Sequence, residues 1–228
     1  MAEHIYTIPL NEHFGKLESC PLCSLFEMME RNEVETITGA SMMEPSVRIQ
    51  TNKEGFCEKH LFQITQVKKK LPVALLFQSH LEELFKDIKG KNGEHQIKRL
   101  DKLEKDCYIC RRIKANMDSI YSNFFHLYKK DSKFHDLFLK QKLFCLPHYK
   151  ELLYYGSKNL SKKEFKIFTE ELDTLEMRYL EELKGDIDWF CKKFDYRFAK
   201  EDWKNSRDAV ERTVYTLCGN LPKNKIEE

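Results

Sequence analysis

Glycine and proline are scarce in this sequence. There are 8 Gly and 6 Pro in 228 residues, whereas Leu, Lys, Glu and Phe are abundant. Few chain-breaking residues and many helix formers favour helices over strands. No stretch shows the strict two-residue alternation of a half-buried strand. The composition therefore predicts an all-α, helical bundle-like protein.

Long apolar runs are also lacking. The densest apolar stretch, residues 71–77, is far shorter than the roughly 18 residues that a membrane-spanning helix requires. The N-terminal segment has no basic start followed by an apolar run, so we expect no secretory signal. These two absences predict a cytoplasmic protein that does not bind a membrane.

Charge of one sign does not dominate the chain. The 39 basic and 37 acidic residues leave a formal net charge of +2. Proteins that bind nucleic acids usually carry a marked excess of positive charge, which this composition does not show. Nucleic-acid binding is therefore a disfavoured alternative.

Motifs of common enzyme classes are absent. The sequence contains no G-x-x-x-x-G-K-[ST] loop, no G-x-G-x-x-G turn and no G-x-S-x-G elbow. Carboxylates occur throughout the chain, so no acid and base pair can be singled out. We therefore identify no catalytic residue, and the sequence favours a protein that is not an enzyme.

Cysteine and histidine are present in a repeated pattern. Two Cys-x-x-Cys pairs are each followed, after 33 or 34 intervening residues, by a Cys-x-x-His pair. The eight residues are Cys20, Cys23, Cys57, His60, Cys107, Cys110, Cys145 and His148. Random placement would produce such a pattern with a chance on the order of one in a thousand. The pattern indicates an internal repeat with two metal sites.

The donor set indicates the metal. Zinc takes four tetrahedral ligands, and Cys₃His is one of its usual structural sets. We therefore expect two Zn²⁺ ions, each held by the starts of two helices that are remote in sequence. An iron–sulfur cluster is the less favoured alternative cofactor. Disulfides are disfavoured in a reducing compartment. Cys191 and Cys218 lie outside the pattern and are expected in the core.

The order of the ligands suggests how they combine. We expect each ion to use one Cys-x-x-Cys pair and the Cys-x-x-His pair that follows it, because a crossed arrangement requires the two halves to interleave. The expected divisions are a first zinc-binding half at 1–90, a second at 91–157 and C-terminal helices at 158–228. A single compact domain that includes all three is the alternative.

Apolar periodicity predicts individual helices and two interruptions. Helices are expected over residues 71–88, 111–128, 165–183 and 203–217, with Leu81 and Phe85 on the apolar face of the first. Gly156 is expected to end one helix, Ser161 to cap the next, and Gly219 to end the last. Residues 39–55 contain two glycines and a proline, which predicts a long ordered loop. Residues 89–106 are charged and predict an exposed connection with a short helix.

A second candidate site is expected outside the metal ligands. Its residues are Met43, Glu44, Arg48, Asn52, His80 and Arg197. Ordered long loops often carry binding residues, so residues 39–52 are expected to bind a small ligand or protein partner and to face the segment around Arg197. In the alternative interpretation these groups only attach the loop and tail to the helices.

The chain resembles an uncharacterised bacterial family of domains of unknown function. The resemblance covers residues 4–219 and is carried by the segments HIYTIPLNEHF, CPLC, GASMMEPSVRIQTN, GFCEKH, CYIC, FCLPHY, DWFCKKFDYR and DWKNSRDAVER. It implies no particular activity, cofactor or partner.

Three functional hypotheses follow from these observations. The first is a non-enzymatic binding or adaptor protein with two structural zinc sites. The second is an enzyme or small-molecule-binding protein with a pocket between residues 39–52 and the C-terminal helices. The third is a nucleic-acid-binding protein with a surface ordered by zinc.

Overall fold

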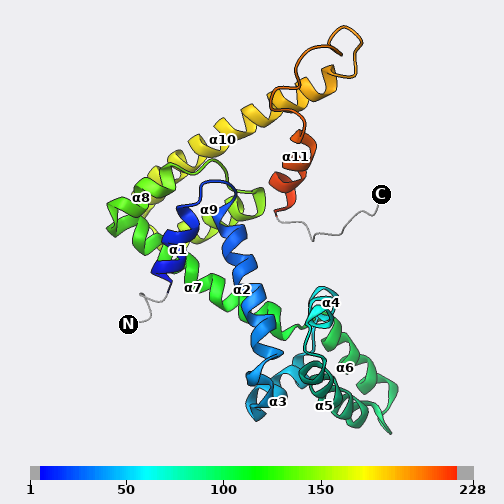
Figure 1. Ribbon diagram of the computed structural model, residues 1–228. Helices are drawn as coiled ribbons and strands as arrows, with labels where there is room; N and C mark the ends of the chain where they lie inside the picture. The colour runs from blue at the N-terminus through cyan, green and yellow to red at the C-terminus, as the bar shows by residue number, and fades with distance from the viewer. Residues whose placement is uncertain (1–5, 220–228) are drawn as a thin grey trace. The chain divides into compact units, whose positions relative to one another are not determined.

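The protein is helical in the part that the computed structural model describes, residues 6–219. This range contains eleven α-helices, one 3₁₀ helix and no strand, which confirms the all-α prediction (Figure 1). The helices are α1 (Thr7–Phe14), α2 (Pro21–Ile37), η2 (Ala40–Met43), α3 (Pro45–Glu54), α4 (Glu58–Gln66), α5 (Lys70–Ile88), α6 (Gly93–Lys105), α7 (Tyr108–Lys130), α8 (Ser132–Leu139), α9 (Leu146–Asn159), α10 (Lys162–Lys192) and α11 (Ala209–Cys218). None of these helices combines the length and apolarity that a membrane crossing requires.

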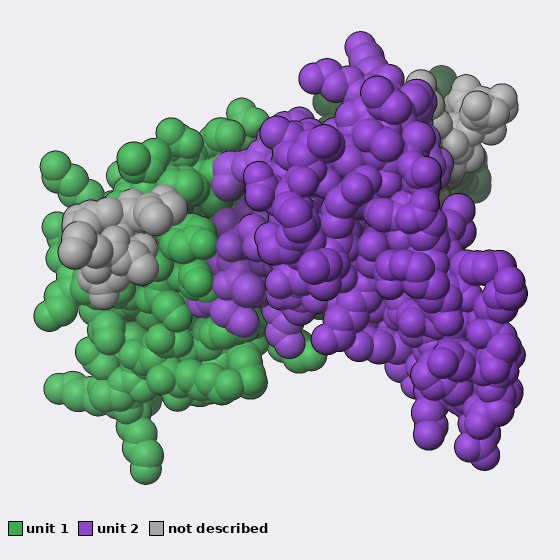
Figure 2. Space-filling view, turned by 90° about the horizontal axis from the view of Figure 1, so that it is seen from below, with its two compact units in different colours: residues 1–25, 119–228 green, residues 26–118 purple. Residues whose placement is uncertain are grey.

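Two compact units make up the chain (Figure 2). Residues 1–25 and 119–228 form one unit, which we call the terminal unit. Residues 26–118 form the other, which we call the central unit. The helices α2 and α7 each begin in one unit and end in the other. The boundaries of the units therefore lie elsewhere than the expected divisions near residues 90 and 157.

An aromatic cluster forms the core of the terminal unit. Its fully buried rings come from α1, α7, α8, α10 and the segment before α9: Phe14, Phe124, Phe134, Phe138, Phe144 and Phe168. The centroids of Phe14 and Phe134 are 5.1 Å apart, and those of Phe138 and Phe168 are 5.6 Å apart. Aromatic pairs at such distances stabilise a fold by about 0.5–1.5 kcal/mol each beyond the area they bury. The cluster thus joins elements that are remote in sequence.

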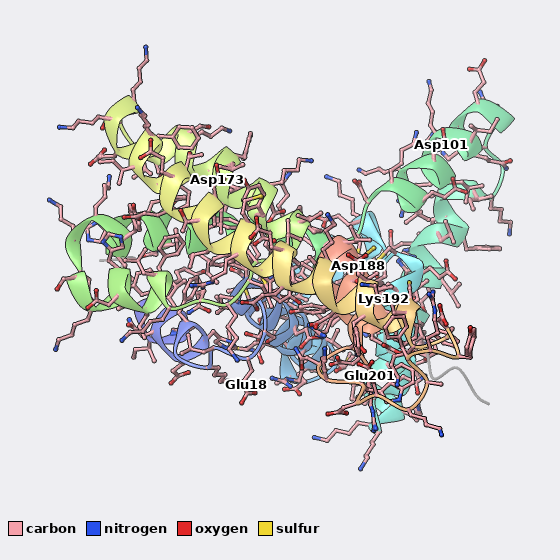
Figure 3. The ribbon with its side chains drawn as sticks, turned by 90° about the horizontal axis from the view of Figure 1, so that it is seen from above. Glu18, Asp101, Asp173, Asp188, Lys192 and Glu201 are labelled. Atoms are coloured by element: carbon pink, nitrogen blue, oxygen red, sulfur yellow. The ribbon has the colours of Figure 1, made fainter. Side chains whose placement is uncertain are left out.

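The helix α10 begins with a complete capping box. The Ser161 hydroxyl accepts the Glu164 backbone N–H, and the Glu164 carboxylate accepts the Ser161 backbone N–H. The helix packs against α9 and α11. Figure 3 labels Asp173, Asp188 and Lys192 along this helix. The predicted cap at Ser161 is therefore confirmed, and the 165–183 helix is part of a longer one.

The central unit contains the segment that we expected to be a loop, and that expectation is wrong. Residues 39–55 form η2 and α3 instead. Pro45 occupies the first turn of α3, where a backbone N–H has no partner within the helix. The N–H that proline lacks is therefore not missed at this position. Gly55 ends the helix with a φ of 67°, which favours glycine. The glycines and the proline therefore mark the ends of a helix rather than a helix-free segment.

Other expected elements differ in detail. The exposed connection at 89–106 is confirmed, because α6 has no buried residue. Gly156 does not end a helix but lies inside α9, where the Phe165 and Phe168 rings leave little room for a larger side chain. The last helix begins at Ala209 rather than near Trp203.

Candidate metal centres

The eight predicted ligands come together in two groups of four. Cys20, Cys23, Cys145 and His148 form one group in the terminal unit, which we call the terminal site. Cys57, His60, Cys107 and Cys110 form the other in the central unit, which we call the central site. Within each group the donor atoms all lie within 4.8 Å of one another.

The expected pairing of the ligands is wrong. The first Cys-x-x-Cys pair combines with the last Cys-x-x-His pair, and the two inner pairs combine with each other. The pairing is nested because residues 1–25 fold with residues 119–228, while residues 26–118 form a unit of their own. The fold thus brings together the remote segments that the crossed arrangement of ligand pairs requires.

Each ligand pair lies at the start of a helix, as predicted. Cys57 and Cys145 are the residues before α4 and α9, and the histidine of each pair follows in the first turn. The Cys-x-x-Cys pairs lie in the same way at the starts of α2 and α7. Free backbone N–H groups and the helix dipole favour thiolates at such positions. Each site therefore joins two helix N-termini.

The distances between donor atoms suit one tetrahedral ion in each group. A zinc ion with its usual bond lengths separates two sulfurs by about 3.8 Å and a sulfur from a nitrogen by about 3.6 Å. The Cys57 and Cys110 Sγ atoms are 3.8 Å apart, and those of Cys23 and Cys145 are 3.5 Å apart. Distances from Sγ to the histidine Nδ1 are 3.1–3.5 Å in the terminal site. They are 3.2–3.4 Å in the central site.

The electrostatics of both groups favour a cation. Burial raises the pKa of Cys20 well above its usual range, and the neighbouring thiols raise it further. Burial lowers the pKa of His148, but its hydrogen bonds to Cys145 and Cys23 outweigh this effect and raise the pKa to about 10. Burial also lowers the pKa of His60, and contacts with Cys107 and Glu30 raise it to about 10. Burial and crowding thus oppose the ionisation of several thiols at once, and a divalent cation bound between them would compensate the negative charge of the thiolates.

A carboxylate faces the far side of each histidine ring. His60 Nε2 is 3.1 Å from Glu30 Oε1, and His148 Nε2 is 4.0 Å from Glu151 Oε2. A carboxylate at Nε2 favours the tautomer whose Nδ1 lone pair points to the thiols. Tyr121 donates a hydrogen bond to the same Glu151 oxygen. The histidines are thus oriented to bind a metal through Nδ1.

The end of α11 covers the terminal site. The Cys20 backbone N–H donates to the Tyr215 hydroxyl at 3.1 Å. Gly219 ends the helix with a φ of 73°, and a Cβ there would lie 3.3 Å from Cys145 Sγ and 3.5 Å from Cys23 Sγ. A larger residue would therefore press on the Cys145 sulfur and touch that of Cys23. All three cysteines of this site are at most 3% exposed.

The central site is more open. Cys110 is exposed and Cys57 is half-buried, whereas His60 is only 2% exposed. The Tyr108 backbone N–H donates to the Gly55 carbonyl at 3.0 Å, which ties the start of α7 to the segment before Cys57. This site is therefore well positioned by the backbone, while solvent reaches one of its sulfurs.

The residues of the second candidate site are divided among several places. Met43, Arg48 and Asn52 line one pocket of about 630 Å³ in the central unit. His80 lines a different, apolar pocket of about 370 Å³ in the same unit. Glu44 is the exposed residue before α3. Arg197 lies in the terminal unit, where it pairs with Asp195 at 2.6 Å. Only three of the six residues therefore share a pocket.

A comparison with protein families covers nearly the whole chain. The family described as "Family of unknown function (DUF6062)" matches residues 1–224. The chain belongs to this family. The match confirms the resemblance to a family of unknown function. No curated protein and no solved structure matches the chain.

Sequence reasoning missed several groups of this DUF6062 protein. Glu30, Glu151 and Tyr215 support the ligands, but no spacing rule connects them with the motifs. Gly219 was predicted to end a helix. Its position close to the thiols was not predicted. Cys191 and Cys218 were expected in the core, but both are exposed, because they lie on the outer faces of amphipathic helices.

Proposed function

We propose that this DUF6062 protein is a non-enzymatic binding or adaptor protein in which one structural zinc ion holds each unit together. The observation that carries the proposal is the convergence of two complete Cys₃His sets, each with all donor atoms within 4.8 Å. Neither unit can close its site without both of its helix starts in place. The ions would thus stabilise the units rather than react.

A structural role follows from the number of protein donors. Catalytic zinc sites usually keep three protein ligands and an open position for water or substrate. Four protein donors complete a tetrahedron and leave no such position. Because thiolate ligation requires reduced cysteines, the proposal includes a cytoplasmic location.

The geometry favours single zinc ions over iron–sulfur clusters. A multi-iron cluster lies between its cysteine ligands and separates their sulfurs by its own width. In each site all four donor atoms lie within 4.8 Å of one another, which leaves room for one ion between them but not for a cluster of several irons. Zinc is the usual occupant of such a sulfur-rich tetrahedral site.

Metal content tests the proposal. Native mass spectrometry and elemental analysis of full-length protein, purified without added metal, should report two zinc ions per chain. Iron with visible absorption, or fewer than about one and a half zinc equivalents in folded protein, contradicts it. Replacement of zinc by Co²⁺ should produce the ligand-field bands of tetrahedral coordination at both sites. The same mass spectrum would reveal any ligand or partner that stays bound.

A further inference from the structure

The pocket that contains Arg48 and Asn52 lies where α3, α5 and α6 contact one another in the central unit. Its volume of about 630 Å³ is in the range of small-molecule sites. Met43, Pro45 and Ile49 form an apolar part of its wall. Met43 and Ile49 are 68% and 67% exposed, so these side chains are available for contact.

Positive charge dominates the rest of the wall. Four cations and two carboxylates line the pocket, which leaves a formal net charge of +2; they are Arg48, Lys53, Arg99, Lys102, Glu83 and Asp87. Both carboxylates already have cationic partners, since Asp87 pairs with Arg99 and Glu83 with Lys86. Arg48, Lys53 and Lys102 form no ion pair with any residue in 6–219. The pocket thus has unpaired positive charge.

Asn52 has a donor that the protein does not use. Asn52 is only 8% exposed, and its side-chain Oδ1 accepts a hydrogen bond from the Ser79 hydroxyl at 3.3 Å. Its backbone carbonyl accepts Arg99 Nη2 at 2.8 Å. The Nδ2 amide donates to no residue that the structure describes. An amide donor left open in the wall of a pocket is available to an acceptor group of a ligand.

Arg48 is similarly incomplete. Its Nη2 donates to the Leu75 carbonyl at 2.9 Å, which holds the guanidinium against α5. Its buried Nε has no hydrogen-bond partner. A guanidinium held in place with unused N–H groups and no carboxylate is suited to an anionic oxygen group.

We infer that this pocket binds a small organic anion. The acidic head of the anion contacts Arg48 and the Asn52 amide, and the apolar body of the anion lies along Met43 and Ile49. The head is a carboxylate or a phosphate, because both present the acceptor oxygens that these donors require. The inference rests on the proposed function only because the central zinc ion would keep the central unit folded.

Calorimetric titration of the full-length protein, with both zinc ions verified by mass spectrometry, tests the inference. The probes are hexanoate, hexyl phosphate, acetate and the neutral hexanol. We expect one six-carbon anion to bind about tenfold or more tightly than hexanol, and more tightly than acetate. The stronger of hexanoate and hexyl phosphate identifies the head group. Two bound zinc ions with no preference for either anion overturn the inference and leave the proposed function intact.

Variants distinguish a binding role of these residues from a purely structural one. Arg48→Gln should weaken the preferred anion about tenfold or more, and Arg48→Lys should restore part of the affinity. Asn52→Asp keeps an acceptor for Ser79 but adds negative charge, so it should abolish binding without loss of folding. Arg31→Gln removes one exposed charge of the same unit outside the pocket and should leave the affinity unchanged. Equal anion affinity in the folded Asn52→Asp protein contradicts the inference.

Discussion

The terminal and central sites have the same donors at the same kind of helix start, yet their surroundings differ. Cys20 and Cys145 of the terminal site are 0% exposed, and the end of α11 lies against that site. In the central site Cys110 is exposed, and the supporting carboxylate of Glu30 is close to the histidine. The Cys₃His sets therefore mark which helix starts meet, whereas the elements packed around each set decide how far solvent reaches its donor residues.

The nested pairing gives the largest expected effect. Structural zinc contributes on the order of 10 kcal/mol of apparent free energy, so loss of a ligand should release the ion and unfold much of that unit. Cys20→Ser combined with Cys145→Ser should remove one zinc ion per chain, because both ligands belong to the terminal site. Cys20→Ser combined with Cys57→Ser should remove two.

Native mass spectrometry of the two double variants measures this difference. Cys191→Ser is the matched control, since this exposed cysteine belongs to neither group, and it should keep both ions. If the Cys20 and Cys145 pair of changes removed both ions and the Cys20 and Cys57 pair removed one, the ligands would combine in sequence order instead.

The difference in exposure predicts different rates of zinc release. An excess of a thiol-reactive reagent should release zinc in two phases, with the central ion leaving at least about tenfold faster, because reagents reach exposed sulfur first. A chromogenic zinc indicator follows the release. In Cys57→Ser protein only the slow phase should remain. A single phase in the unmodified protein would show that the difference in burial has no effect on access.

The carboxylates behind the histidines predict a difference in zinc affinity. Glu30→Gln should lower the affinity of the central site about 10–100-fold, because its contact with His60 Nε2 is 3.1 Å. Glu151→Gln should have a smaller effect on the terminal site, since its distance from His148 Nε2 is 4.0 Å. Competition with a chelator measures both affinities. Lys59→Met, which removes the lysine that pairs with Glu30, should change the zinc affinity little.

Two glycines with the same φ test how closely the end of α11 packs against the terminal site. Gly219 and Gly90 both have a φ of 73°, but a Cβ at Gly90 would meet no atom within 4 Å. Gly90→Ala should therefore cost only the backbone strain of about 1 kcal/mol. Gly219→Ala should cost at least about 1 kcal/mol more, because its ψ of −156° lies in a region that only glycine adopts readily and because its Cβ would press on the Cys145 sulfur. Urea unfolding of zinc-loaded protein compares the free energies of unfolding of the two variants. Equal losses of stability would mean that the end of α11 shifts without cost.

The smallest expected effect concerns a buried carboxyl group of the terminal unit. Glu176 is 0% exposed, and its Oε2 accepts the backbone N–H of Phe144, the residue before Cys145. Burial raises the pKa of Glu176 above its ordinary value of 4.5, although the Phe144 hydrogen bond opposes this. Between the two pKa values the folded state holds a proton that the unfolded state has lost, so this contribution to stability falls as pH rises.

Glu176→Gln should remove that dependence and preserve the acceptor for Phe144. At pH 7 the variant should equal the unmodified protein in stability or exceed it by less than about 1 kcal/mol. Urea unfolding at pH 5 and pH 7 measures the change in slope. A variant that is less stable at pH 7 than at pH 5, by as much as the unmodified protein, would assign the pH dependence to other groups.

Some features were predictable because they depend on nearby residues. The Ser161 cap and the apolar spacing of α5, α7 and α10 follow from contacts within a few helical turns. Residues 39–55 were misassigned because glycine and proline have opposite meanings at the ends and in the middle of a helix. Periodicity also predicted buried residues that are exposed: Leu81 and Phe85 of α5 are 62% and 61% exposed. An apolar helix face shows only that burial of the face would be favourable. It does not show that another element covers the face.

The sequence by itself determined the helical class and the eight candidate ligands, because a two-residue gap lets the first turn of one helix present two donors to the same point. Only the tertiary structure decided which pairs combine. The reason is that α2 and α7 each begin at one site and continue into the other unit. Further along α2, Glu30 contacts His60 of the central site, and Tyr121 of α7 contacts Glu151 beside His148 of the terminal site. These are long-range contacts, which the spacing of the motifs does not encode.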